Sequence, residues 1–143
     1  MHIRPVSEHD LEDIIRIDEQ ISGKRRANHW ESRITYVIRR DPDGSLVAEN
    51  DGRVVGFIIA DVRGEEFGFS QTTGWVEVLA VHPDYQRKEV AKSLVEHVMK
   101  RFRTVGVSDV RTLVGDNHAD LKTFFESVGF AAEPVVVYHK KVS

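Results

Sequence analysis

The chain has 143 residues, of which 41% are hydrophobic and 30% charged, and these values predict one soluble globular domain over residues 1–143. Its net charge of −3 argues against a nucleic-acid partner, and the absence of cysteine excludes disulfides, thiolate metal sites and a cysteine nucleophile. No apolar run reaches the roughly 20 residues of a transmembrane helix, and the N-terminal residues resemble a strand rather than a signal peptide. We therefore expect a cytoplasmic protein with no membrane partner.

The N-terminal part of the chain predicts a strand followed by two helices. Residues 3–6 predict a short edge strand, because Pro5 cannot donate to a sheet ladder. Ser7–Asp10 resembles a capping box, which opens a first helix with apolar residues at helical spacing. Residues 30–38 carry the apolar stripe of a second helix.

The remainder of the chain predicts strands that alternate with helices. Two strands, 45–49 and 54–62, are joined by Asn-Asp-Gly, a sequence typical of a hairpin turn. The later elements are a strand at 75–81, a helix with an apolar face from Val90 to Phe102, a strand at 107–114, a helix at 120–128 and a strand at 135–138. The order β-α-α-β-β-β-α-β-α-β predicts an α/β sandwich around a mixed sheet.

Residues 75–94 are the most informative part of the sequence for function. An apolar strand at 76–81 leads into a His-Pro-Asp-Tyr turn, then a short basic loop, and then an amphipathic helix. Such a unit directs loop N–H groups and the positive end of the helix dipole at one point, which suits a phosphate or pyrophosphate.

This stretch resembles the acyl-CoA-binding motif of the GNAT N-acetyltransferase superfamily, whose loop reads Gln/Arg-x-x-Gly-x-Gly/Ala. The corresponding positions here are Gln86, Arg87, Lys88, Glu89, Val90 and Ala91, so that a glutamate replaces the glycine. A second stretch, from Asn117 to Phe130, is similar to the later motif of the family, in which a helix ends in aromatic-x-x-x-Gly-Phe. The resemblance extends from Ile3 to about Val142. It implies a GNAT-like, mostly antiparallel sheet of six to seven strands flanked by about four helices.

The resemblance implies an N-acetyltransferase that moves an acetyl group from acetyl-CoA, its co-substrate, to a primary amine. The amine would belong to a protein N-terminus, a lysine or a small molecule. In the family the fourth and fifth strands separate, and the pantetheine arm lies between them. The implied cofactor contacts are Leu79, Ala80, Val81, Gln86, Arg87, Lys88, Glu89, Val90, Ala91, Lys92, Asn117 and Phe125. Residues 79–81 would offer backbone groups to the pantetheine amides, and residues 86–91 would surround the pyrophosphate.

Glu89 is the main departure from the family pattern. Its side chain restricts the backbone torsions and the close phosphate approach that a glycine allows. A carboxylate about 5 Å from a phosphate charge costs on the order of 3 kcal/mol at an effective dielectric of 20. We therefore expect weakened CoA binding. The alternative is a catalytically degenerate GNAT-fold module that binds a ligand or partner.

Glu77 is the candidate catalytic base, because attack on a thioester needs a neutral amine and a base must remove the proton of the ammonium, often through water. It lies in an otherwise apolar strand, where a partly desolvated carboxylate is a better base; the alternative is an ordinary solvent-exposed strand residue. Many relatives place a proton-donating Tyr at the position of Phe125. The general acid is therefore unassigned, with Tyr138 and Tyr85 as weak candidates.

Several other residues have two interpretations each. The candidates for the acceptor side are Gly23–Arg26, Trp30, Trp75, Asp18, Glu19 and Glu31, which could equally belong to the surface or the core. The seven histidines show no metal-ligand spacing, so we expect no metal. The apolar residues 135–137 could serve a homodimer or form a buried strand.

Overall fold

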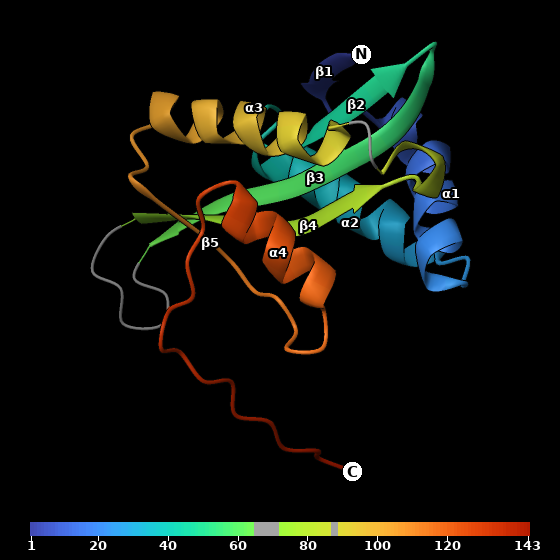
Figure 1. The fold of residues 1–143 in the computed structure, drawn as a ribbon. Helices are drawn as coiled ribbons and strands as arrows, with labels where there is room; N and C mark the ends of the chain where they lie inside the picture. The colour runs from blue at the N-terminus through green and yellow to red at the C-terminus, as the bar shows by residue number, and fades with distance from the viewer. Residues whose placement is uncertain (65–71, 87–88) are drawn as a thin grey trace. The chain divides into compact units, whose positions relative to one another are not determined.

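The computed structural model describes residues 1–64, 72–86 and 89–143. The chain divides into two compact units, residues 1–113 and residues 114–143, and each is considered by itself. The first unit holds a five-stranded sheet in the order β1-β2-β3-β4-β5 (Figure 1). The strands are β1 (His2–Pro5), β2 (Leu46–Asn50), β3 (Arg53–Gly64), β4 (Thr72–Val81) and β5 (Asp109–Thr112).

The sheet is antiparallel from β1 to β4, and β5 joins β4 in parallel. The predicted hairpin between β2 and β3 is confirmed. Its turn residues Asp51 and Gly52 both have positive φ, 51° and 77°, as a tight turn between twisted strands requires. The antiparallel pairing of β2 with β3 therefore follows from a short local connection.

Two helices, α1 (Leu11–Ser22) and α2 (Ala27–Arg40), cover one face of the sheet, and α3 (Val90–Thr104) covers the other (Figure 1). The predicted capping box is confirmed. The Ser7 hydroxyl accepts a hydrogen bond from the His9 N–H at 3.2 Å, and the Asp10 carboxylate accepts one from the Ser7 N–H at 2.8 Å. A 3-10 turn (Glu8–Asp10) separates this cap from α1.

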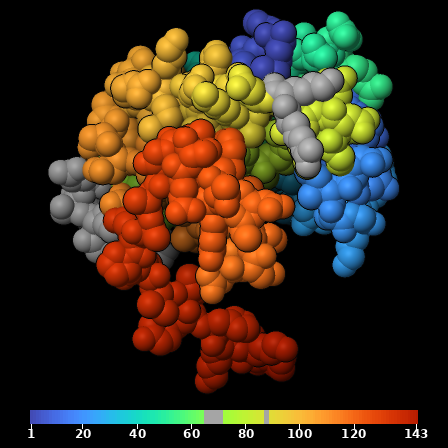
Figure 2. Space-filling view, in the orientation of Figure 1, coloured from blue at the N-terminus to red at the C-terminus, as the bar shows by residue number. Residues whose placement is uncertain are grey.

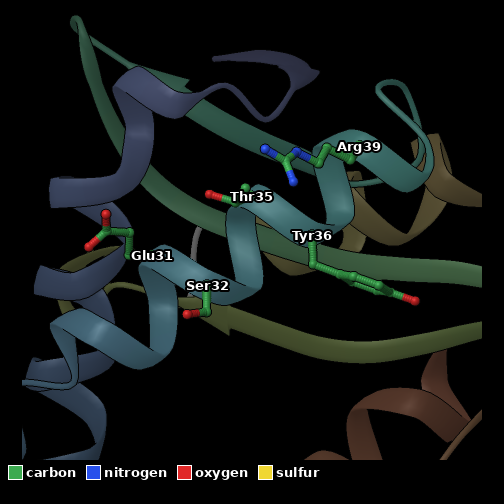
Figure 3. A pocket seen from close by; sticks show the side chains of 5 residues that line it. All are labelled: Glu31, Ser32, Thr35, Tyr36 and Arg39. Carbon is green, nitrogen blue, oxygen red and sulfur yellow. The ribbon is translucent and has the colours of Figure 1, made fainter.

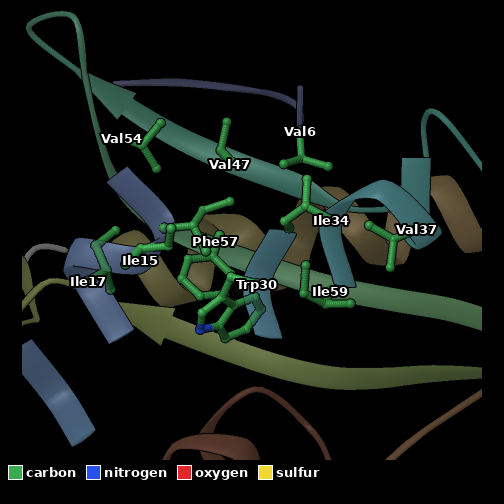
Figure 4. Close-up of a cluster of buried hydrophobic side chains, with 11 residues drawn as sticks. Val6, Ile15, Ile17, Trp30, Ile34, Val37, Val47, Val54, Phe57 and Ile59 are labelled. Atoms are coloured by element: carbon green, nitrogen blue, oxygen red, sulfur yellow. The ribbon is translucent and has the colours of Figure 1, made fainter. Parts of the chain in front are cut away.

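The main core lies between the sheet and the helices α1 and α2 (Figure 4). The indole of Trp30 packs edge-on against the Phe57 ring with the ring centroids 5.3 Å apart. Strand β3 is buried on both faces from Val54 to Ala60. Side chains two residues apart share a face, so Phe57 and Ile59 both enter this core, to which α2 contributes Ile34. Burial of such side chains contributes about 1.5–3 kcal/mol each and holds α2 against the strands.

The position of α3 depends on two glycines of the sheet. A Cβ at Gly56 would lie 2.9 Å from Val90, at the start of the helix, and 3.2 Å from the Ala80 carbonyl. A Cβ at Gly74 would lie 2.9 Å from the Phe102 ring, near the end of the helix. The space-filling view shows α3 (yellow to light orange) as a continuous layer (Figure 2). Both ends of α3 therefore approach the sheet at positions where a side chain would not fit.

The second unit contains α4 (Ala119–Ser127). The ring of Phe125 packs edge-on against Phe124 and Phe130, with centroids 5.3 and 5.1 Å apart. The helix ends as predicted at Gly129, which has a φ of 99°. The Phe130 N–H donates to the Phe125 carbonyl and closes this end of the helix.

The predicted last strand at 135–138 is wrong. These residues have no regular secondary structure, and Val137 and Tyr138 are 75% and 93% exposed. A β-prone sequence becomes a strand only where a neighbouring strand accepts its ladder hydrogen bonds, and no such pairing is recorded for 135–138 in the described part of the chain. The described residues therefore form five strands, fewer than the six to seven that we predicted, and the final β of the predicted order is not formed.

Candidate functional site

Strand β4 changes its strand pairing and its burial at Glu77. Up to that point, Thr73–Val76 pairs with β3 on one side and with β5 on the other. The register with β5 ends at the pair Val76 and Thr112, where the Thr112 hydroxyl donates to the Val76 carbonyl at 2.8 Å. The strand continues to Val81 with β3 as its only ladder partner among the described residues. We call Thr73–Val76 the paired half of β4 and Glu77–Val81 the open half.

A β-bulge marks the boundary between the two halves. Ile59 of β3 lies opposite Val78, and the next residue, Ala60, lies opposite Val76, so Glu77 is the extra residue. Burial changes at the same point: Thr73–Val76 is buried, whereas 78–80 is half-buried. A bulge bends its strand and redirects a side chain, and here it presents Glu77 beside the start of the open half.

The Glu77 carboxylate is bound by two arginines. Arg63 of β3 donates from Nη2 to the Glu77 Oε2, and Arg33 of α2 has its Nη2 3.8 Å from the Glu77 Oε1. The Glu77 side chain is 24% exposed, although the residue as a whole is exposed, so its carboxylate is partly shielded from solvent. Because its partners come from β3 and α2, the carboxylate lies on the face of the sheet that α2 covers.

Arg63 belongs to a chain of alternating charges. Its Nε lies 3.4 Å from the Asp61 carboxylate, and Asp61 in turn accepts a hydrogen bond from the Arg40 Nε at 2.6 Å. Burial lowers the pKa of the Arg63 guanidinium, but Glu77 and Asp61 outweigh that effect and raise it overall. The Asp61 carboxylate also raises the pKa of Arg40. The charge chain Arg40–Asp61–Arg63–Glu77–Arg33 thus begins and ends on α2 and holds Glu77 in a defined place.

Three residues of this chain of charges were not predicted from the sequence: Arg33, Asp61 and Arg63. One signal for two of them was present, because Asp61 and Arg63 are two residues apart on a strand and so share the face of Phe57 and Ile59. Opposite charges on the inner face of a strand indicate a partnered site rather than a solvated surface. The contribution of Arg33 depends on the packing of α2 over β4, which the helix period alone does not specify.

The turn after β4 brings the chain back over the end of the strand. The His82 N–H donates to the Val55 carbonyl at 2.8 Å, and a 3-10 turn (Pro83–Tyr85) follows. Gln86 donates from Nε2 to the Val81 carbonyl at 3.4 Å. The predicted cofactor residues Arg87 and Lys88 lie outside the described residues.

Glu89 adopts the conformation for which the family uses a glycine. Its φ of 61° and ψ of 17° lie in the left-handed region, and it is the N-terminal cap residue of α3. Within the described part of the chain no side chain caps this helix, so the first-turn N–H groups of Val90, Ala91 and Lys92 are open to an anion. Val90 is buried, whereas Glu89 and Lys92 are exposed and no ion pair between these two is recorded. The strain expected from the sequence is therefore present, and the Glu89 carboxylate is free to point into solvent.

The second unit supplies the other two predicted cofactor residues. Asn117 is exposed in the turn before α4, a turn closed by the His118 N–H donating to the Gly115 carbonyl at 2.9 Å. Phe125 is 5% exposed. Lys122 pairs with Asp116 in the same unit and lowers the pKa of that carboxyl.

Most of the residues considered for the acceptor side have structural roles. Trp30 and Trp75 are 2% and 5% exposed and belong to the core. Arg25 pairs with Glu12 at 2.9 Å and with Glu19 at 3.8 Å. The basic segment at 23–26 therefore folds back onto α1.

Arg26 binds Asp18 through two hydrogen bonds of 2.6 and 2.9 Å. This guanidinium is the main cause of a lowered pKa at Asp18; burial opposes the shift and the Trp30 indole adds to it. Asp18 is therefore a partnered carboxylate and is not free to attract a cation.

A shallow hollow lies on the outer face of α2, with a volume of about 410 Å³. Its lining residues are Glu31, Ser32, Thr35, Tyr36 and Arg39 (Figure 3). All of these residues belong to α2, so the hollow is an open groove along the surface of one helix. The Tyr36 ring is 58% exposed there.

Two general properties complete the description of the site. In residues 1–64, 72–86 and 89–143, no three His, Asp or Glu side chains are placed to hold a metal ion. Each helix in these same ranges is too short or too polar to cross a membrane.

Comparison with known proteins identifies the family. The model of the acetyltransferase (GNAT) family matches residues 9–130. The acetyltransferase SG1711 of Sodalis glossinidius is 32% identical over 125 residues, which cover 87% of this chain and 83% of the relative. An acetyltransferase of Yersinia pestis (strain Pestoides F) is 25% identical over 142 residues, covering 99% and 96% of the two chains.

Solved structures show the same fold. The aminoglycoside N-acetyltransferase AAC(6')-Iy, determined in complex with CoA, superposes with a TM-score of 0.87 at 19% identity. The match covers 99% of this chain and 95% of that protein. Ard1 from Thermoplasma volcanium superposes with a TM-score of 0.77 at 22% identity, covering 91% and 82%.

Proposed function

Because the chain belongs to the GNAT acetyltransferase family, we propose that it transfers the acetyl group of acetyl-CoA to a primary amine of a small molecule or a protein. One observation carries the proposal: β4 loses its β5 partner at the bulge where Glu77 is placed. A single strand thus offers unpaired backbone groups along one half and a carboxylate at the boundary.

The residues of this chain fit acetyl-CoA. Its pantetheine arm carries amides that can pair with backbone groups. Because residues of an antiparallel ladder alternate and His82 bonds Val55, Leu79 and Val81 turn their groups away from β3 toward the arm, with Ala80 between them bonded to β3. Its pyrophosphate is an anion, and the uncapped first turn of α3 offers N–H groups at Val90 and Ala91. The open half spans four residue steps, about 13 Å of strand, which lets a thioester at the far end of the arm reach Glu77.

Further contacts are proposals of the same kind. Arg87 and Lys88 would supply positive charge to the pyrophosphate together with Lys92, and Gln86 would fix the loop against the end of β4. Asn117 and Phe125 belong to the second unit, and their contacts with the cofactor stay predictions. Glu89 would weaken binding, because its carboxylate repels the phosphates.

The Glu77 carboxylate would act as the base. The amine nitrogen attacks the thioester carbonyl, a C–N bond forms and the C–S bond breaks. The proton lost by the nitrogen passes to Glu77, directly or through one water. Arg63 and Arg33 hold the carboxylate in place for that transfer. Phe125 has no hydroxyl, so the departing thiolate takes its proton from solvent.

A coupled assay tests this function. CoA release from acetyl-CoA should be measured with a panel of primary amines, including a peptide N-terminus, lysine and a small aliphatic amine. We expect release that depends on the amine and that falls steeply in Glu77→Gln. Glu96→Gln is the matched control, because Glu96 is an exposed residue of α3 and its loss should leave the rate unchanged. Acetyl-CoA binding without transfer to any amine would contradict the enzyme proposal and favour a ligand-binding module.

A further inference from the structure

Arg33 is the least occupied arginine in the charge chain around Glu77. A guanidinium has five N–H donors, and within the described ranges the polar contact recorded for Arg33 is the 3.8 Å approach to Glu77. By contrast, Arg40 lies 2.6 Å from Asp61 and also donates to the Val62 carbonyl at 3.1 Å. The Arg33 side chain is 29% exposed. It therefore retains donors that can reach a ligand beside Glu77.

The charges near Glu77 do not suit a polycationic acceptor. The Asp61 carboxylate is neutralised by Arg40. The charge chain itself contains three arginines and two carboxylates, a net charge of +1. A substrate with several ammonium groups would meet the excess positive charge of this region, and like charges brought together are repelled.

The pair formed by Arg33 and Glu77 complements a zwitterion. The two side chains bear opposite charges, lie 3.8 Å apart and are both partly exposed. An α-amino acid carries its ammonium and carboxylate groups on one carbon, in the same close juxtaposition and with the signs reversed. Resting on the proposed function, we propose that the acceptor amine bears an acid group beside its nitrogen, as an α-amino acid does, and that Arg33 binds this acid group while Glu77 receives the proton from the nitrogen.

Paired substrates test the proposal. Each of the twenty common α-amino acids should be compared with its α-amide, which keeps the amine and lacks the carboxylate, and with an aminoglycoside as the polycationic arm. We expect at least one amino acid to exceed its amide by roughly ten- to a hundredfold in kcat/KM, the effect of one charge-assisted hydrogen bond. The difference should reside mainly in KM. Amides that equal or exceed every parent amino acid, or a preference for the aminoglycoside, would overturn the proposal.

Variants assign the preference to Arg33. Arg33→Gln should abolish the difference between acid and amide, and Arg33→Lys should restore part of it, because lysine keeps the charge without the planar fork. Arg39→Gln is the matched control: Arg39 is an exposed arginine of the same helix and lines the outer hollow. An undiminished preference in Arg33→Gln would overturn the assignment.

Calorimetry separates this inference from the proposed function. Amino acids should be titrated into the protein saturated with CoA, where no transfer occurs. Binding that requires Arg33 upholds the inference even if no amine is acetylated, an outcome that would contradict only the enzyme proposal. Transfer to amines with no amino-acid binding and no acid preference would leave the enzyme proposal intact and overturn the inference.

Discussion

The paired and open halves of β4 differ in what they contribute to the protein. The paired half, Thr73–Val76, has strands on both sides and is buried. The open half, Glu77–Val81, has β3 on one side and is half-buried over 78–80. One strand thus secures the sheet with its first half and exposes unpaired backbone with its second, and the bulge at Glu77 separates the two roles. Changes in the paired half should therefore alter stability, and changes in the open half should alter activity.

The largest effect is expected at the boundary. Glu77→Gln keeps the shape of the side chain and removes its ability to take a proton, so kcat should fall about 10²- to 10⁴-fold. Stability should change by less than about 1 kcal/mol, since partly exposed ion pairs contribute little. CoA-release kinetics and urea unfolding on the same preparation measure both quantities. Retention of the full rate would refute the assignment of Glu77 as the base.

The paired half should show the opposite response. Gly74→Ala places a Cβ 2.9 Å from the Phe102 ring, and overpacking of this kind costs about 1–3 kcal/mol. Urea unfolding should detect this loss, while the affinity for acetyl-CoA stays unchanged in the folded protein. Gly64→Ala is the control, because a Cβ at Gly64 meets no atom of the described residues within 4 Å. Equal stability of the two variants would contradict the role given to Gly74.

A smaller change, a gain in stability, is expected at Glu89, which follows the open half of β4 in the chain. Glu89→Gly relieves a left-handed φ of 61° and should raise the free energy of unfolding by about 1 kcal/mol. Glu89→Gln retains the Cβ and should show no such gain, which separates backbone strain from charge. Urea unfolding of the three proteins in parallel makes the comparison. A Glu89→Gly protein no more stable than Glu89→Gln would show that strain is not the cost of this residue.

The smallest effect concerns a charge pair outside both halves. Arg26 lowers the pKa of Asp18 below its ordinary value of 3.8, so the pair stabilises the folded state fully above that value. This stabilisation is lost as the pH falls through the lower, folded-state pKa. Between about pH 5 and pH 2 the parent protein should therefore lose more stability than Asp18→Asn. Equal slopes in urea midpoints against pH would show that the pair has no part in acid unfolding, whereas acetyl transfer at pH 7 should be unaffected by the substitution.

The sequence predicted the local features of the fold better than the pairing of its last predicted strand. The capping box at Ser7 and the hairpin at Asp51 and Gly52 are confirmed, because short-range hydrogen bonds and backbone torsions decide both. The strand predicted at 135–138 is not formed, since apolar β-branched residues show only that a segment can pair and not that a partner is available. Pairing of this kind depends on residues distant in the sequence.

The local elements of the candidate site were predictable from the sequence, whereas the contacts between elements distant in sequence were not. The apolar run at 76–81 and the helical pattern after it predicted that Glu77 lies on a strand and that a helix starts near Val90, which the structure confirms. The resemblance to a glycine motif indicated strain at Glu89, which is confirmed by its positive φ. The partners Arg33 and Arg63 were not predicted, because they meet Glu77 through the packing of α2 and the register of β3. The roles of the predicted cofactor residues stay predictions.

Amide NMR spectra recorded with and without acetyl-CoA would test the central claim most directly. We predict large shift changes at Leu79, Ala80 and Val81 and at the first turn of α3, with the amides of Thr73–Val76 unchanged. Glu89→Gly should reach the same end point at a lower acetyl-CoA concentration. Saturable changes confined to other parts of the chain, or no change in either protein, would contradict the claim that the open half of β4 binds acetyl-CoA.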